Sequence, residues 1–173
     1  MKRRLFIALL VIATVVAAVI YFPLGYPNNR IPAGALQALQ SDSNLILYSI
    51  DPERFTYSDS GERQPLSDNE PKFHTYRVLG QTVLTSPNSR RITLDTIRHA
   101  VRDWDGEIHG CFNPRHGIRA TDSSGTHDFL ICFQCRQVYL YSPDGTSTQL
   151  YIRGAPDPLN SILTAAHVPL PTR

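Results

Sequence analysis

Residues 127–153, HDFLICFQCRQVYLYSPDGTSTQLYIR, decide the fold that the sequence predicts. The continuous apolar run near the start of this stretch is typical of a central strand, and QVYLYS after it alternates side chains between two faces. The Ser-Pro-Asp-Gly sequence at 142–145 predicts a turn, because proline presets φ and glycine accepts a positive φ. TSTQLYIR then returns as the hairpin partner, so we expect this part of the chain to form an antiparallel sheet.

Helices are predicted on both sides of this stretch. In ITLDTIRHAVRDWDG, residues 92–106, the apolar positions recur at helical spacing, and Gly106 occupies the position of a C-capping glycine. A second helix is expected to begin with Asp157 as its N-cap. Strands are predicted at 44–50 and, as a strand or strand pair, at 73–85. The order of elements indicates an α+β fold, a small antiparallel sheet with helices packed on one face.

The first residues predict a membrane segment. Lys2, Arg3 and Arg4 precede an uncharged apolar run at 5–22, which as a helix would reach about 27 Å, enough for a bilayer core. Because the positive charges precede the run, the positive-inside rule places the N-terminus in the cytoplasm. We therefore expect a signal anchor, that is, a transmembrane helix, over 1–26, with a cleaved signal peptide as the alternative.

The remaining chain divides into a linker and one domain. Residues 27–43 are expected to form a tether and a short helix, and residues 44–173 an α+β domain with a polar loop at 53–72. The predicted orientation of the anchor places this domain outside the cytoplasm. The sequence thus predicts a single-pass membrane protein whose domain lies outside the cytoplasm.

The distribution of charge excludes nucleic-acid binding as the main activity. Three of the 17 Lys and Arg residues lie at positions 2–4, and the remaining 14 nearly balance the 15 Asp and Glu residues. A nucleic-acid-binding domain usually carries a marked basic excess. We therefore expect no nucleic-acid partner.

All three cysteines lie between 111 and 135, and an oxidising compartment favours a disulfide among Cys111, Cys132 and Cys135. On a regular strand, side chains three positions apart point to opposite faces, so only one of Cys132 and Cys135 suits Cys111. We predict a Cys111–Cys132 disulfide, because each of these cysteines precedes a phenylalanine on what we expect to be neighbouring strands.

A metal- or thiol-dependent site is the alternative to the disulfide. A tetrahedral Cys3His zinc site would take Cys111, Cys132, Cys135 and one of His109, His116 or His127. The C-x-x-C pair also occurs in redox proteins, but there it begins a helix, whereas a β-like run follows here. Buried free thiols are the third possibility.

The segment RHGIR at 115–119 offers a candidate anion site. Arg115, His116 and Arg119 can hold an anion by charge-assisted hydrogen bonds if they lie near one another, and a solvated turn after Pro114 is the alternative. The segment resembles the RHGxR core of histidine phosphatases, which implies His116 as a phosphate-accepting nucleophile. The chain has no room for the large α/β domain of that family, so we expect no phosphatase activity and assign no catalytic residue.

Four short motifs resemble one bacterial family. YSIDP, YRVLG, CFNPRHGIRA and ICFQC, spread over residues 45–153, are similar to a group of bacterial proteins with a C-F-x-P-R-H-G-I core followed by I-C-F-x-C. The group has no assigned activity. The resemblance therefore implies a bacterial origin and the unity of the C-terminal domain, but no reaction.

These observations favour a non-enzymatic domain that binds an envelope protein or a small ligand. The polar loop 53–72 and the segment 115–119 are the expected contact surfaces. The membrane is the expected partner of the N-terminal helix. No cofactor is expected, with zinc as the alternative if the cysteines form a metal- or thiol-dependent site.

Overall fold

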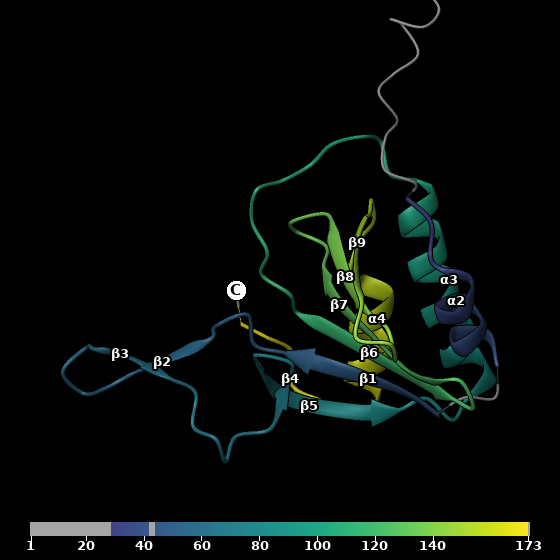
Figure 1. Ribbon diagram of the computed structural model, residues 1–173. Helices are drawn as coiled ribbons and strands as arrows, with labels where there is room; N and C mark the ends of the chain where they lie inside the picture. The colour runs from purple at the N-terminus through teal and green to yellow at the C-terminus, as the bar shows by residue number, and fades with distance from the viewer. Residues whose placement is uncertain (1–28, 42–43, 173) are drawn as a thin grey trace, which may run out of the picture.

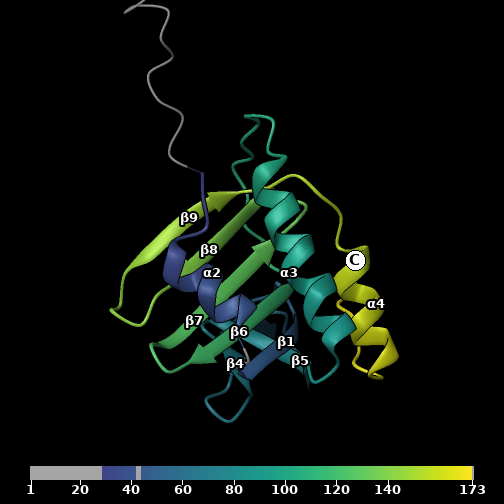
Figure 2. The ribbon, with the colours of Figure 1, turned by 90° about the vertical axis from the view of Figure 1, so that its right-hand side faces the viewer.

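The computed structural model describes residues 29–41 and 44–172, and these form a curled antiparallel sheet with three helices on one face (Figure 1, Figure 2). The helices are α2 (Ala33–Gln40), α3 (Pro87–Arg102) and α4 (Asp157–Ala165). The seven strands of the sheet, in their order across it, are β4 (Lys72–Phe73), β5 (Tyr76–Val83), β1 (Asn44–Ile50), β6 (His116–Asp122), β7 (Gly125–Cys132), β8 (Gln137–Tyr141) and β9 (Ser147–Tyr151).

The strands β6 to β9 form a meander in which each strand pairs antiparallel with the next. The predicted turn at 142–145 joins β8 to β9. There the Gly145 N–H donates to the Ser142 carbonyl at 3.0 Å, and Gly145 has the positive φ of 83° that the turn requires. On the other side of the sheet, β1 lies between β5 and β6. The segment that contains α3 therefore connects two strands that flank β1.

The main hydrophobic core lies between the sheet and the helices. Ile118 of β6 and Phe129 of β7 face this layer, and Ile97 of α3 and Leu163 of α4 pack against the sheet from the helix side. All four side chains are fully buried. Burial of an apolar side chain of this size contributes about 1.5–3 kcal/mol, so this interface is the main source of stability.

A second, smaller cluster covers the opposite face of the sheet. It includes Tyr48, Ile50 and Phe73, and the rings of Tyr48 and Phe73 lie 4.5 Å apart. Gly117 of β6 lies beneath this cluster, where a Cβ atom would be 2.8 Å from the Phe73 ring and 2.9 Å from Ile50. Glycine at this position therefore lets the cluster contact the backbone of the sheet.

The helix boundaries differ from the sequence predictions by a few residues. Helix α3 begins at Pro87 and ends at Arg102, with Asp103 as its C-cap. Gly106 has the positive φ expected of it, at 88°, but it lies in the loop after the helix. Pro156 rather than Asp157 is the N-cap of α4.

The polar loop predicted at 53–72 contains a small two-stranded hairpin, β2 (Phe55–Tyr57) paired with β3 (Arg63–Pro65). This hairpin extends away from the sheet (Figure 1). Two of its aromatic side chains are exposed, with Tyr57 at 60% and Phe55 at 38%. Arg63 lies over the ring of Phe55 at 4.8 Å.

The predicted fold class and localisation need a correction. Among residues 29–41 and 44–172, no helix combines the length and the apolar character needed to span a bilayer. This finding contradicts the prediction of a single-pass membrane protein with a transmembrane helix and an extracytoplasmic domain. The segment 1–26, to which we had assigned that helix, lies outside the described residues. The described fold is the antiparallel sheet with its three helices.

Candidate functional site

The candidate site is a groove of about 760 Å³ at the N-terminus of α4. We call it the His116 groove, after the buried histidine in its lining, and its polar or aromatic residues include Asn113, Arg115, His116, Phe133, Asp157 and Asn160. The segment 111–116 and the β7–β8 turn both contribute to it. The two halves of CFNPRHG…ICFQC therefore meet at this groove.

His116 is the most unusual polar residue in the groove. Its side chain is buried, with 2% of the residue exposed, and its Nε2 atom donates a hydrogen bond to Oδ1 of Asn160 at 2.8 Å. Burial lowers the pKa of His116 to about 4, although the hydrogen bond to Asn160 acts in the opposite direction. The ring is therefore neutral at pH 7, and its Nδ1 atom is an acceptor.

The Nδ1 atom of His116 is buried and has no hydrogen-bond partner among the described residues. An unsatisfied buried polar atom costs about 1–3 kcal/mol, so such atoms are rare in folded proteins. The ring of Phe133 lies edge-on to the imidazole at 5.8 Å and holds it from one side. The lining of the groove thus contains a neutral imidazole whose buried Nδ1 atom has no partner among the described residues.

The charged groups of the groove have opposite signs. Arg115 donates from Nη1 to the carbonyl of Thr172 at 3.1 Å, and its guanidinium has four further N–H bonds. Asp157 begins α4, where no side-chain cap is present among the described residues. The N-terminus of a helix also carries a partial positive charge. The groove therefore offers a cation, an anion and a neutral acceptor.

The cysteine pairing differs from our prediction. Cys111 pairs with Cys135, with their Cα atoms 5.5 Å apart, and Cys132 is buried outside the pair. The prediction of a Cys111–Cys132 disulfide assumed a regular strand through Cys135. Residues 133–136 instead form a turn in which Arg136 has a φ of 56°, and this turn brings Cys135 towards Cys111.

Arg119, the third predicted anion-binding residue, does not contribute to the groove. The side chains of His116 and Arg119 are three positions apart on β6 and point to opposite faces of the sheet. His116 contacts α4, whereas Arg119 lies over Phe73 on the other face. The structure therefore brings Arg115 and His116 together in one groove and separates Arg119 from them. This separation also removes the shared phosphate site that the RHGxR resemblance implied.

Arg119 belongs instead to a polar cluster around Asp128. Its Nε and Nη2 atoms donate to the two carboxylate oxygens of Asp128 at 2.8 and 2.6 Å. His74 Nε2 lies 3.1 Å from Asp128, and its ring stacks on Tyr141 at 4.0 Å. Burial raises the pKa of Asp128, but the hydrogen bonds from Arg119 and His74 outweigh burial and keep this pKa below its usual value. This cluster joins the β4–β5 turn to the sheet.

The two histidines His116 and His127, which were alternative zinc ligands, lie at opposite ends of the β6–β7 pair. His127 is buried near Gly34 of α2, whereas His116 lies at the other end of the β6–β7 pair, next to α4. Residues 29–41 and 44–172 contain no group of three or more His, Cys, Asp or Glu side chains that could hold a metal ion. The Cys3His hypothesis therefore has no ligand set in this part of the chain.

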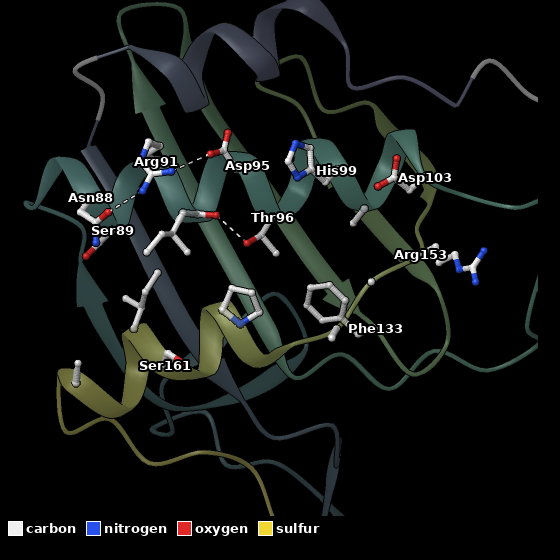
Figure 3. Close-up of a pocket in the computed structure, with 17 residues that line it drawn as sticks. Asn88, Ser89, Arg91, Asp95, Thr96, His99, Asp103, Phe133, Arg153 and Ser161 are labelled. Atoms are coloured by element: carbon white, nitrogen blue, oxygen red, sulfur yellow. Dashed lines mark hydrogen bonds and ion pairs between the residues drawn. The ribbon is translucent and has the colours of Figure 1, made fainter.

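A second groove lies between α3 and α4 (Figure 3) and adjoins the His116 groove, with which it shares part of its lining. Both grooves include Phe133, Gly154 and Ala155. The α3 side of the second groove carries polar side chains, among them an exposed ion pair of Arg91 with Asp95 at 3.4 Å. Phe133 thus separates a polar helix surface from the buried imidazole of His116.

Comparison of the chain with protein-family models, curated proteins and solved structures finds no match. The resemblance to the bacterial C-F-x-P-R-H-G-I group stays a prediction. The case for function therefore depends on the geometry of the groove.

Two residues of the groove escaped the sequence analysis. Asn160 lies in the middle of a predicted helix, and no local pattern indicates its contact with His116. Phe133 entered the disulfide prediction as the neighbour of Cys132 but was not predicted as a site residue. The sequence did contain one indication for Phe133, because this residue lies between Cys132 and Cys135, which were both candidate site residues.

Proposed function

We propose that this protein binds a small zwitterionic ligand of the amino-acid type in the His116 groove, as a binding protein rather than an enzyme. The observation that carries the proposal is the buried, neutral His116 with an unpartnered Nδ1 atom. The groove volume of about 760 Å³ falls within the usual range for small-molecule sites.

The carboxylate of such a ligand is matched by Arg115. Its planar guanidinium can donate two parallel hydrogen bonds to a carboxylate, and among the described residues only its Nη1 atom is engaged, with the Thr172 carbonyl. The N-terminus of α4 lies in the same groove and adds a partial positive charge. The Arg115 guanidinium favours an anionic group beside it, whereas the N-terminus of α4 already carries the Asp157 carboxylate.

The ammonium group of the ligand is matched by two acceptors. Asp157 supplies a carboxylate, and His116 supplies the lone pair of Nδ1. Because Nε2 of His116 donates to Asn160, the tautomer is fixed with Nδ1 as acceptor. A ligand with only an anionic group would leave both acceptors without a donor.

The test is a calorimetric titration of the full chain with each common amino acid in turn. Acetate and methylammonium, titrated alone, each carry one of the two charged groups and are expected to bind more weakly than any amino acid that binds. Absence of binding by every amino acid, or equal binding of acetate alone, would contradict the proposal.

Two variants locate the binding site. Arg115→Gln is expected to weaken binding about tenfold or more, since a hydrogen bond to a charged group contributes about 1.5–3 kcal/mol. His116→Gln is expected to weaken it as well. His127→Gln is the matched control, because His127 is also a buried histidine with an unpartnered Nδ1 but lies outside the groove. Equal losses in both histidine variants would indicate a folding effect.

A further inference from the structure

The third cysteine lies beside the Cys111–Cys135 disulfide. Cys132 and Cys135 are joined by the β7–β8 turn, and the Cys135 N–H donates to the sulfur of Cys132 at 3.0 Å. Asn113, two residues after Cys111, donates its N–H to the sulfur of Cys135 at 3.3 Å. These contacts place the Cys132 thiol, the disulfide and the 111–113 segment at one point.

We propose that Cys132 is an internal nucleophile that converts the Cys111–Cys135 disulfide into a Cys132–Cys135 disulfide. In this step the Cys132 thiolate attacks the sulfur of Cys135, the Cys132–Cys135 bond forms, and the Cys111–Cys135 bond breaks. Cys111 leaves as a thiolate and takes up the proton that Cys132 lost. The number of disulfides is unchanged, so the step needs no oxidant or reductant.

The surroundings of the three sulfurs favour this direction of attack. Cys111 is exposed, whereas Cys132 and Cys135 are buried. The leaving thiolate of Cys111 is therefore solvated as it forms. Attack on Cys135 also closes a short loop within one turn, which requires less chain rearrangement than a new link between distant segments.

Burial sets the rate of the exchange. It raises the pKa of the Cys132 thiol, although backbone N–H groups of Asn113, Cys135 and Gln134 act in the opposite direction. The thiolate is the attacking species, so the exchange is slow at neutral pH and faster as the pH rises. The Cys111–Cys135 pair is the one that the structure holds, and we call it the resting form.

The exchange changes the His116 groove without unfolding the domain. Phe133 and Gln134, which line the groove, lie between Cys132 and Cys135 and would be drawn into a smaller ring. In the structure, Gln137 donates from Nε2 to the carbonyl of Cys111 at 3.2 Å, and this contact between β8 and the 111–113 segment does not involve the disulfide. An effect of the exchange on ligand affinity rests on the proposed function. The exchange itself does not depend on that function.

Trypsin separates the two pairings cleanly. Cleavage after Arg102, Arg115, Arg119 and Arg136 places Cys111 on peptide 103–115 and both other cysteines on peptide 120–136. The resting form links these two peptides. The exchanged form leaves peptide 103–115 free, with Cys111 available for alkylation, and gives peptide 120–136 an internal disulfide.

The experiment incubates the full chain, without reductant, at neutral pH and at about pH 9, where more of the thiol is ionised. The protein is then quenched in acid, alkylated after denaturation and digested. We expect alkylated Cys111 to increase with time and to increase faster at the higher pH, while circular dichroism stays native. If Cys132 is the alkylated cysteine in all molecules under both conditions, the proposal is wrong.

Two variants complete the test. Cys132→Ser lacks the nucleophile, so it should keep peptides 103–115 and 120–136 linked at both pH values. Cys111→Ser lacks the resting partner, and after air oxidation it should contain the Cys132–Cys135 disulfide. Two alkylated thiols in that variant would overturn the proposal. The readout is the cysteine connectivity, so this test of the exchange does not depend on the result of any ligand titration.

Discussion

The Nε2 atom of His116 lies 2.8 Å from Oδ1 of Asn160, and this contact joins the first residue of β6 to α4 across 44 positions of sequence. Asn160 fixes the tautomer of the imidazole and holds α4 against the end of β6. This hydrogen bond therefore adds to the core packing of α4 and to the Phe133 contact in fixing the histidine and the helix N-terminus on either side of the groove.

The first prediction concerns that bond. Asn160→Ala would leave both nitrogens of a buried imidazole without a partner, so we expect the free energy of unfolding to fall by about 1–3 kcal/mol. Urea denaturation monitored by circular dichroism measures the change. Asn69→Ala, at an exposed site in the 53–72 loop, is the control and should have little effect. A loss no larger than that of the control would show that Asn160 does not hold His116.

The second prediction is a pH dependence of stability. Burial lowers the pKa of His116 from 6.5 to about 4, so between these values the unfolded chain binds more protons than the folded protein. The free energy of unfolding then rises with pH across this window. The contribution of neutral His116 is fully present above about pH 6.5 and is lost as the pH falls towards 4. The loss is about 3 kcal/mol, since one pKa unit corresponds to about 1.4 kcal/mol.

Denaturation of the wild type and of His116→Gln at several pH values tests this slope. The difference between the two proteins should grow from pH 4 to pH 6.5 and then stay constant. An NMR titration of the imidazole gives an independent measurement of the pKa of His116. If the ring of His116 titrates near its ordinary pKa of 6.5, the predicted burial is wrong.

The strands and helices with clear periodicity were predictable from the sequence. The alternation in QVYLYS, the turn at 142–145 and the apolar stripe of residues 92–105 each depend on local patterns, and β8, its turn to β9 and α3 follow them. Gly80, whose place inside the run 73–85 indicates a bulge or a turn, lies next to the register shift of β5 against β1 between Ser49 and Ile50. The local sequence pattern is enough to predict elements of this kind.

The wrong predictions, those of the anion site and of the disulfide, have one cause. In each, the local backbone conformation determines which side chains meet, and the sequence does not indicate that conformation. The anion-site prediction requires Arg115, His116 and Arg119 to lie near one another, but β6 begins at His116, and strand alternation places Arg119 on the other face. Cys135 was treated as a strand residue, but it lies in a turn. The contact of His74 with Asp128 joins positions 54 residues apart, and no pattern in the sequence indicates it.

The third prediction concerns the Asp128 cluster. Asp128 is largely buried and accepts hydrogen bonds from Arg119 and His74, so removal of the guanidinium leaves a buried carboxylate with one partner. Because 40% of the Arg119 side chain is exposed, solvent screens part of the interaction, and we expect Arg119→Gln to cost about 1–2 kcal/mol. Urea denaturation at pH 7 measures this loss.

A double-mutant cycle with Asp128→Asn isolates the pair, and the second substitution should add little once Arg119 is absent. The contribution of the pair is present at neutral pH. Because the pKa of Asp128 is lowered in the folded protein, this stabilising contribution is lost as the pH falls below about 3.8. Arg102→Gln, which removes an exposed ion pair with Asp103, is the control and should give no measurable change. Fully additive losses in the cycle would contradict the pairing.

The fourth prediction tests the close packing of the aromatic cluster on the sheet. Gly117→Ala places a Cβ atom 2.8 Å from the Phe73 ring and 2.9 Å from Ile50. Both neighbours are fully buried, so neither side chain can move into solvent without loss of its own packing. Overpacking of this kind costs about 1–3 kcal/mol, and we expect a loss of that size in urea denaturation.

Gly110→Ala is the matched control for this substitution. A Cβ atom there has no described atom within 4 Å, so the same chemical change should leave stability nearly unaltered. The displaced Phe73 ring would also move its neighbour His74, whose ring it meets edge-on at 5.1 Å. Gly117→Ala should therefore shift the NMR signals of His74 more than those of His99 on α3. Equal stability of the two alanine variants would show that the second face of the sheet is loosely packed.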